Sequence, residues 1–289
     1  MAALDVATDV EAVREARSRR SAGMLFWAAT AWIALVIVTA VLADLLPLPS
    51  PTDMDMLGRR MPPDLEHWLG TDGLGRDTLA RLIFGARTSL IVGLGASLLG
   101  LLFGGALGIV AGYYRGKFET LTMGGVDVLL AFPPLVLALA ITAYLGQSVF
   151  NLTAIVGFLS IPPFARVARA ATLALAQRDF ITAARALGAT DARILLRELL
   201  PNVLLPLLAF FLLAVAVVIV VEGALSLLGL GVPPPQSSWG SMIGEGRESL
   251  DVAPWLAFIP AGAMFLTVLS FNIIGDTLRA ITDPREGAL

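Results

Sequence analysis

The chain contains few side chains that could carry out covalent chemistry. His67 is its only histidine, Lys117 is its only lysine, and it has no cysteine. A lone histidine cannot build a Ser/His hydrolase or a His-rich metal site, and the lack of cysteine excludes disulfides and thiolate catalysis. Lys117 lies in GYYRGKFE, which lacks the Gly-rich turn and following Ser or Thr of a phosphate-binding loop. We interpret His67 as a polar loop residue beside Trp68, with a metal or substrate contact as the alternative.

Three carboxylates lie within or beside long apolar runs. Glu222 is expected near the outer end of its run, and Asp127 and Asp276 near the inner ends of theirs. A charge at the centre of a membrane costs about 2.5–3.5 kcal/mol, so such residues are candidates for lining a solute pathway. The alternative for each is a structural hydrogen bond to a neighbouring helix. No nucleophile, base and orienting group can be assembled from these runs, which argues against a membrane-embedded enzyme.

The elements that hold these residues are apolar enough to require a bilayer. The chain is 57% hydrophobic and 15% charged, with a mean hydropathy of +0.81 and a net charge of -3. This composition predicts an all-α integral membrane protein, and the small net charge gives no reason to expect nucleic acid. Nearly uncharged runs predict six spans, at 24–43, 90–114, 121–145, 150–165 (completed through 176), 203–221 and 252–275.

These runs divide the chain into five segments. We predict a cytoplasmic tail at 1–23, a first transmembrane helix at 24–46, an extracytoplasmic loop at 47–88, a five-helix core at 89–284 and a C-terminal tail at 285–289. Of the 20 Arg and Lys side chains, 14 then fall on the side of the N-terminus. The positive-inside rule therefore predicts that both termini are cytoplasmic. A cysteine at Arg193 should be labelled from the cytoplasm and one at Ser237 from outside.

A polar segment at 177–202, QRDFITAARALGATDARILLRELLPN, interrupts the apolar runs on the cytoplasmic side. It cannot lie in hydrocarbon, so it must face water and is large enough to contact a partner. Phe180, Ala183, Ala184 and Leu187 recur at helical spacing and predict an amphipathic helix. Gly188 should end that helix. Thr190 is then a plausible N-cap for a second helix that we expect to end near Pro201.

Small residues line one face of the second expected span. Gly100, Gly104, Gly108 and Gly112 are four residues apart, so they stack along one side of a helix. Their lack of side chains allows a neighbouring helix to approach closely. That neighbour is expected within this subunit or, as the alternative, in a sister subunit. The stripe is structural in both cases.

The polar segment resembles the cytoplasmic EAA loop of permease subunits in binding-protein-dependent ABC importers. Ala183, Ala184, Gly188, Leu200 and Pro201 match that pattern, while Thr182 stands where the family usually has Glu. Residues from about 24 to 284 also resemble the C-type permease subunit of the dipeptide, oligopeptide and nickel branch of these importers. It is carried by HWLGTDGLGRD from His67, RLIFGARTSL from Arg81, the Ala131-Phe132-Pro133 turn, LSLLGLGVPPPQSSWGSMI from Leu225 and FNIIGDTLRAITDP from Phe271.

The resemblance implies a type I ABC importer fold in a bacterial inner membrane. It implies a sister six-span permease, two ATPase subunits that hold ATP and Mg, and an extracytoplasmic substrate-binding protein, with no cofactor on this chain. The segment that would couple to the ATPase includes Asp179, Phe180, Thr182, Ala183, Ala184, Gly188, Leu200 and Pro201. The implied substrates are dipeptides or oligopeptides, with nickel or glutathione as alternatives. A secondary transporter is the rival class, although inverted repeats and several buried ionisable groups are absent from the sequence.

Overall fold

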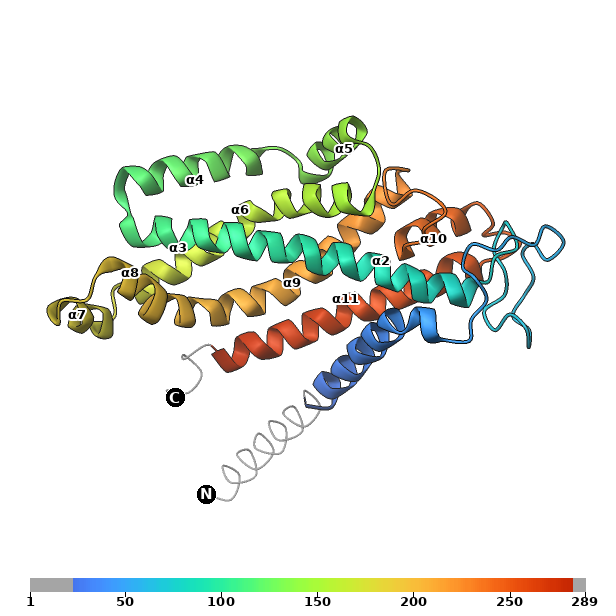
Figure 1. Ribbon diagram of the computed structural model, residues 1–289, viewed down its shortest axis with the longest axis horizontal. Coiled ribbons are helices and arrows are strands. Elements are labelled where there is room, and N and C mark those ends of the chain that lie inside the picture. Colours follow the sequence, from blue (N-terminus) through green and yellow to red (C-terminus); the bar gives the residue numbers. More distant parts are fainter. Residues whose placement is uncertain (1–22, 283–289) are drawn as a thin grey trace, which may run out of the picture.

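A computed structural model describes residues 23–282, and this part of the chain is helical, without a named strand (Figure 1). Most of the expected tails, 1–23 and 285–289, lie outside the described residues. The elements are the first helix Gly23–Val41, η1 Ala43–Leu45, α2 Thr78–Leu99, the π-helix η2 Gly100–Gly104, α3 Gly105–Tyr114, α4 Gly116–Ala131, α5 Pro134–Leu145, α6 Val149–Leu175, α7 Asp179–Ala186, α8 Asp191–Arg193, the π-helix η3 Ile194–Leu199, α9 Leu200–Leu227, α10 Trp239–Arg247 and α11 Trp255–Thr282.

Within residues 23–282, five helices are long and apolar enough to cross a membrane, and counting the bent pair α4–α5 as one broken span gives six. The expected all-α membrane fold is confirmed. The third expected span, 121–145, is divided into α4 and α5, which are bent by 84°. The break falls at Phe132 and Pro133. Proline lacks an N–H and disfavours helical geometry at the residue before it, so the run ends one helix and starts another.

The second span is longer than its uncharged run. It extends continuously from Thr78 to Tyr114 over 37 residues, so it begins within the expected loop at 47–88. The Asp77 side chain caps the helix by accepting a hydrogen bond from the Ala80 N–H at 2.7 Å. At 1.5 Å per residue the span is about 55 Å long, well beyond a hydrocarbon core of about 30 Å. Its first turns therefore stand outside the membrane, where Arg81 and Arg87 are tolerated.

The glycine stripe of the second span packs against α6. A Cβ at Gly104 or Gly108 would collide with the carbonyl oxygen of Ile161 or Ala165, and one at Gly100 would press on Phe164. A Cβ at Gly112 would lie 3.0 Å from the Arg169 carbonyl oxygen. The stripe thus faces a helix of the same subunit, the first of the two alternatives.

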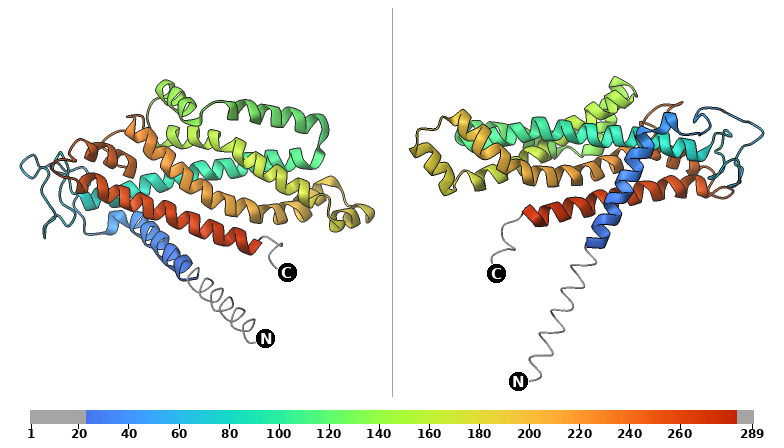
Figure 2. Two further views of the ribbon diagram at one scale, coloured as in Figure 1. Left: turned by 180° about the vertical axis from the view of Figure 1, so that it is seen from behind. Right: turned by 60° about the horizontal axis from the view of Figure 1, so that its bottom comes forward.

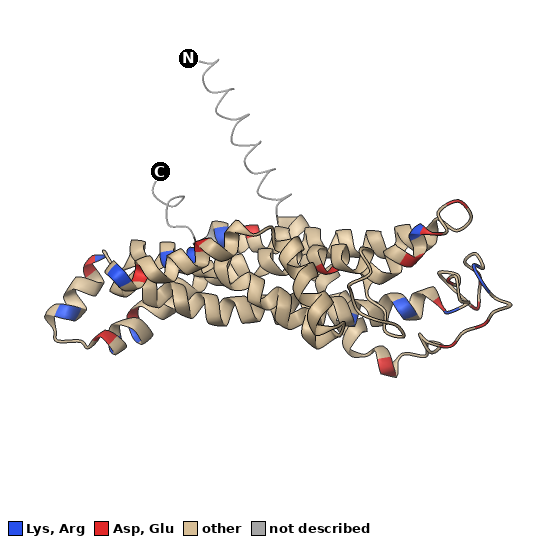
Figure 3. Ribbon diagram, turned by 90° about the horizontal axis from the view of Figure 1, so that it is seen from above, with Lys and Arg blue, Asp and Glu red and all other residues tan. Residues whose placement is uncertain are grey.

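The helices α2, α6, α10 and α11 pack around α9. Val215 and Ile219 of α9 lie in a buried cluster with Leu90 of α2, Phe271 of α11 and Trp239 of α10. The resulting bundle has one apolar middle and two charged ends (Figure 3). The α7–α8 segment projects from one end, and the loop before α2 lies with α10 at the other (Figure 1). Figure 2 shows that the first helix begins, and α11 ends, toward the end that carries α7.

The two charged ends should lie on opposite sides of the membrane. Arg193 on α8 is exposed and suits a cytoplasmic reporter. Ser237 does not suit an external reporter, because it is 4% exposed and its hydroxyl donates to the Arg81 carbonyl oxygen at 3.0 Å. Leu57, which is 98% exposed in the outer loop, replaces it.

We predict that Arg193→Cys reacts with an impermeant maleimide only from the cytoplasmic side, and Leu57→Cys only from the external side. The sequence has no cysteine, so the unmodified chain is a clean control. Sided vesicles of known orientation give the measurement. The reverse labelling pattern would show that the two ends lie on the opposite sides from those predicted.

Candidate functional site

The polar segment between α6 and α9 forms a helix, a turn and a longer helix. Gly188 has φ +79°, a left-handed conformation that a residue without Cβ adopts at little cost. Its N–H donates to the Arg185 carbonyl oxygen at 2.9 Å, and the Ala189 N–H donates to that of Ala184 at 3.0 Å. This pair of bonds is a Schellman motif, which ends α7. The Thr190 hydroxyl then caps α8 by accepting from the Arg193 N–H.

The expected end of the second helix near Pro201 is wrong. The helix runs without interruption from Asp191 to Leu227 and becomes the fifth span. Pro201 lies in the first turn of α9, directly after the π-helical turns of Ile194–Leu199. The wider π-helical turns change the hydrogen-bond pattern ahead of the proline, and this is how its ring and missing N–H are accommodated.

One apolar residue anchors α7 to the rest of the protein, while two others face outward. Ile181 is fully buried in a cluster with Tyr113, Ile194 and Leu199. The periodic pattern did not single out Ile181, because it does not share a face with Phe180 and Leu187. Those two side chains are 39% and 88% exposed. Of the other coupling candidates, Ala184 is half-buried, and the exposed ones are Asp179, Thr182, Ala183, Gly188, Leu200 and Pro201.

The segment is also tied to the inner end of the second span. The Tyr113 hydroxyl donates to the Asp191 carboxylate at 2.6 Å, and the Arg185 guanidinium lies 5.5 Å from the centre of the Tyr113 ring. These contacts join α7 and α8 to α3. The segment therefore has rigid links to two long spans, α3 and the continuous helix that contains α9.

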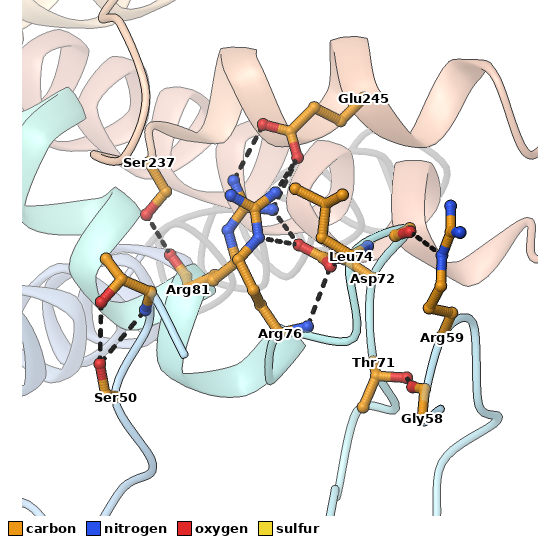
Figure 4. Close-up of polar contacts among 12 residues, drawn as sticks. Ser50, Gly58, Arg59, Thr71, Asp72, Leu74, Arg76, Arg81, Ser237 and Glu245 are labelled. Carbon is orange, nitrogen blue, oxygen red and sulfur yellow. Dashed lines mark hydrogen bonds and ion pairs between the residues drawn. The ribbon is translucent and has the colours of Figure 1, made fainter. Parts of the chain in front are cut away.

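A cluster of four charges, three of which are buried, holds the other end together (Figure 4). Arg76 donates to Asp72 through Nε at 2.7 Å and to Glu245 through Nη2 at 2.7 Å. Arg81 donates to Asp72 and, through both Nη atoms, to Glu245 at 2.6 and 2.9 Å. Asp72 and Arg76 belong to the outer loop, Arg81 to α2 and Glu245 to α10. The cluster thus fastens the loop and α10 to the outer end of the second span.

Burial and charge act in opposite directions on Asp72. Burial alone would raise its pKa, but Arg81, the N–H groups of Leu74 and Arg76, and the Arg76 charge together hold the pKa below its ordinary value of 3.8. Asp72 is therefore ionised at neutral pH and completes the ion cluster. The HWLGTDGLGRD motif contains Asp72 and Arg76, but the sequence alone gave neither residue a role.

An open cavity of about 770 Å³ lies beside this cluster. It is bounded by the outer loop, the turn between α5 and α6, and α10 with the segments on either side of it, and its lining includes Arg59, Gln147, Gln236 and Glu248. His67 does not line this cavity. Its imidazole Nδ1 atom lies 2.8 Å from the Asp77 carboxylate, so it helps to hold the side chain that caps α2. In residues 23–282, no three His, Asp or Glu side chains gather as a metal site requires.

Glu222 is fully buried within the subunit. Its carboxylate accepts hydrogen bonds from Ser89 of α2 at 3.2 Å and from Ser226 of α9 at 2.8 Å. The Ser89 hydroxyl in turn accepts from the Trp239 N–H at the start of α10. This geometry favours the helix-to-helix hydrogen bond over a position on an open pathway. Asp276 is exposed on α11, and Asp127 is exposed on α4 and paired with Arg166.

The apolar spans and their two charged ends define a multi-pass membrane protein. Residues 100–287 match the family described as binding-protein-dependent transport system inner membrane component. The chain is 40% identical over 259 residues to the glutathione transport system permease protein GsiD of Pectobacterium atrosepticum, covering 89% of this chain and 86% of that protein. It is 41% identical over 251 residues to a putative peptide transport system permease protein of Brucella suis biovar 1, covering 87% and 84%.

A solved structure supports the fold. An inward-facing form of the MetNI methionine ABC transporter matches with a TM-score of 0.57 and 20% identity, over 71% of this chain and 98% of that one. The chain therefore belongs to the binding-protein-dependent transport system inner membrane components. It is a permease component of an ABC importer in the bacterial inner membrane, and it is not an enzyme.

The outer charge cluster makes a stability prediction. Arg81→Met leaves the buried Asp72 carboxylate with one cation fewer beside it. Breaking a buried ion pair costs about 3–5 kcal/mol, and we expect a value near the lower limit because Glu245 is 41% exposed. The control is Arg87→Met, whose ion pair with Asp44 is more exposed and should cost under about 1 kcal/mol. Thermal midpoints and tryptic cleavage at Arg59 and Arg60 give the measurement. Equal midpoints and equal cleavage in the two variants would contradict the role of the cluster.

Glu222 makes a second prediction. Glu222→Gln keeps one oxygen for Ser89 and can reorganise its bond to Ser226, so assembly and transport should stay within about twofold of the unmodified protein. Glu222→Ala removes both acceptors and should lower stability by about 1–2 kcal/mol. Yield, thermal midpoint and solute uptake are compared for both variants. Normal assembly with strongly reduced transport in the Gln variant would instead identify a pathway role.

Proposed function

We propose that this chain is one of two permease subunits in an ATP-driven importer of short peptides. The named relatives include glutathione and peptide permeases, and glutathione is itself a tripeptide. A substrate-binding protein would deliver the solute to the outer end of the bundle. Two ATPase subunits, which hold ATP and Mg, would act on the cytoplasmic end.

The exposed apolar surface of α7 is the observation that carries this proposal. Leu187 is 88% exposed and Phe180 is 39% exposed, and α7 projects beyond the bundle (Figure 1). Burying a leucine of this kind contributes about 1.5–3 kcal/mol, so a partner gains by covering it. The position of this surface at the cytoplasmic end favours an ATPase subunit as that partner.

The rigid links of α7 suggest how movement would pass to the membrane. Ile181 seats α7 on η3, and Tyr113 ties α8 to the second span through Asp191. Both long helices lead from there to the outer end. A displacement of α7 by the ATPase would therefore move α3 and α9 together as rigid bodies and exchange inward and outward access.

The outer end is suited to receive a binding protein. The ion cluster of Asp72, Arg76, Arg81 and Glu245 holds the outer loop and α10 as one firm surface around the cavity. A preorganised surface of this kind loses little conformational entropy when a partner docks. We assign the docking of the loaded binding protein to this end.

The coupling proposal is tested with Gly188→Val. A β-branched residue is strained at φ +79°, so the turn between α7 and α8 should distort and substrate-dependent ATP hydrolysis should fall by about tenfold. The matched control is Gly146→Val, since Gly146 has φ +81° in the turn between α5 and α6 and is likewise free of close neighbours.

The measurement is ATPase activity of the complete reconstituted complex, with and without the loaded binding protein. The Gly146 variant should retain stimulation while the Gly188 variant loses it. Unchanged stimulation of ATPase activity in Gly188→Val, or an equal loss of stimulation in both variants, would contradict the coupling role.

A further inference from the structure

The inner end of the second span is joined to the polar segment by one short hydrogen bond. The Tyr113 hydroxyl donates to the Asp191 carboxylate at 2.6 Å, within the range of about 2.5–2.7 Å that is typical of a hydroxyl bonded to a carboxylate. Tyr113 is 8% exposed, and its ring lies in the buried cluster that holds α7. Asp191 is the first residue of α8, directly after the Thr190 cap. Both partners are therefore held at fixed places on their helices.

The covalent path from the polar segment into the fifth span contains several features that weaken a helix. It passes through the π-helical turns Ile194–Leu199, then through Pro201 in the first turn of α9 and Pro206 inside α9. A π-helical turn changes the hydrogen-bond ladder and a proline removes one of its bonds, so helices bend preferentially at such places. A displacement of α7 and α8 is therefore partly absorbed by bending within residues 194–206.

The second span provides a stiffer connection. Its 37 residues, Thr78–Tyr114, contain no proline. Its π-helical stretch, Gly100–Gly104, is pressed against α6, because a Cβ at Gly104 would collide with the Ile161 carbonyl oxygen. Close packing of this kind has low compressibility and transmits strain. The second span therefore passes a displacement of its inner end toward its outer end.

The outer end of the same span carries the charge cluster. Arg81 donates to Glu245 of α10 through both Nη atoms, at 2.6 and 2.9 Å, and to Asp72 of the outer loop. Arg81 lies about 48 Å from Tyr113 along the helix, at a rise of 1.5 Å per residue. One helix is thus bonded to the polar segment at its inner end, and to the outer loop and α10 at its outer end.

We propose that Tyr113 is a positioning residue for transport, and that its bond to Asp191 makes the second span the principal connection between the ATPase and the loaded binding protein. The inference rests on the proposed function and names the residue through which the two ends act on each other. Without the hydroxyl, Ile181 still holds α7 to the bundle, but a displacement of α7 passes only into the weaker start of the fifth span. ATP hydrolysis then continues with a smaller response to the binding protein.

The test is Tyr113→Phe in the complete complex with its sister permease and ATPase subunits. This substitution removes only the hydroxyl and keeps the ring in its buried cluster and beside the Arg185 guanidinium. Basal ATP hydrolysis should stay within about twofold, whereas its stimulation by the dipeptide-loaded binding protein should fall at least about threefold, because a bond to a charged group is lost. The amount of dipeptide moved per ATP should fall with the stimulation.

The matched control is the neighbouring tyrosine. Tyr114 is 54% exposed, and its hydroxyl makes no hydrogen bond within residues 23–282, so Tyr114→Phe should keep full stimulation. Equal behaviour of the two Phe variants would overturn the role of Tyr113. A bond that served stability alone would lower the thermal midpoint, basal hydrolysis and stimulated hydrolysis together, and that result would also overturn it.

The acceptor is tested at Asp191. Asp191→Asn keeps an oxygen for the Tyr113 hydroxyl and should retain most of the stimulation, while Asp191→Ala removes the acceptor and should match Tyr113→Phe. If the two residues act through their shared bond, the double variant Tyr113→Phe/Asp191→Ala should lose no more than either single variant, within about twofold. Fully additive losses would contradict the inference.

The choice of connection is tested at Pro206. Pro206→Ala restores a backbone N–H to the fifth helix and so stiffens the alternative path. With Tyr113 unmodified, this variant should change stimulation by less than about twofold, because the second span already carries the displacement. A change as large as that in Tyr113→Phe would show that the fifth span is the principal connection.

These results separate the inference from the function on which it rests. If the loaded binding protein does not stimulate the unmodified complex, or if Gly188→Val leaves stimulation unchanged, the proposed coupling fails and the inference falls with it. If Gly188→Val abolishes stimulation while Tyr113→Phe keeps it in full, the coupling segment stands and only the role of Tyr113 is overturned. Loss in Tyr113→Phe with full stimulation in Tyr114→Phe is the result we expect.

Discussion

A bilayer offers no hydrogen-bond partners, and most features of this protein follow from that constraint. Backbone groups are satisfied within helices, and charges are either moved to the two ends or paired. Glu222 shows the rule inside the bundle, because its buried carboxylate is held by Ser89 and Ser226. The Arg166–Asp127 pair is the informative exception. It is paired, but its side chains remain 55% and 60% exposed.

The same constraint separates two kinds of contact between helices. The glycine stripe brings the second span so close to α6 that a single added carbon at Gly104 or Gly108 would collide with backbone. By contrast, α4 contacts α6 largely through charged side chains and leaves Gly124 facing open space. The first contact holds the two helices close together, while the second leaves one face of α4 exposed.

Continuity of two long helices links the ends of the molecule. The second span and the helix Asp191–Leu227 each contain 37 residues, so each extends well beyond the hydrocarbon at one end. Asp191, at the start of one, bonds to Tyr113, near the end of the other. At the outer side, Arg81 of the second span holds α10 through Glu245. Two unbroken helices and these contacts therefore join the α7–α8 segment to the loop and α10 at the other end.

The sequence by itself determined the class of the protein and much of its local structure. Apolar runs and charge placement predicted the helical membrane fold, and Gly188 and Thr190 marked a turn and a cap that the structure contains. These signals are local, because burial in lipid and left-handed backbone depend on nearby residues. Tertiary structure alone decided which distant groups meet. Arg81 reaches Glu245, and Asp127 reaches Arg166, only because helices far apart in the chain pack side by side, and no spacing in a single sequence records that packing.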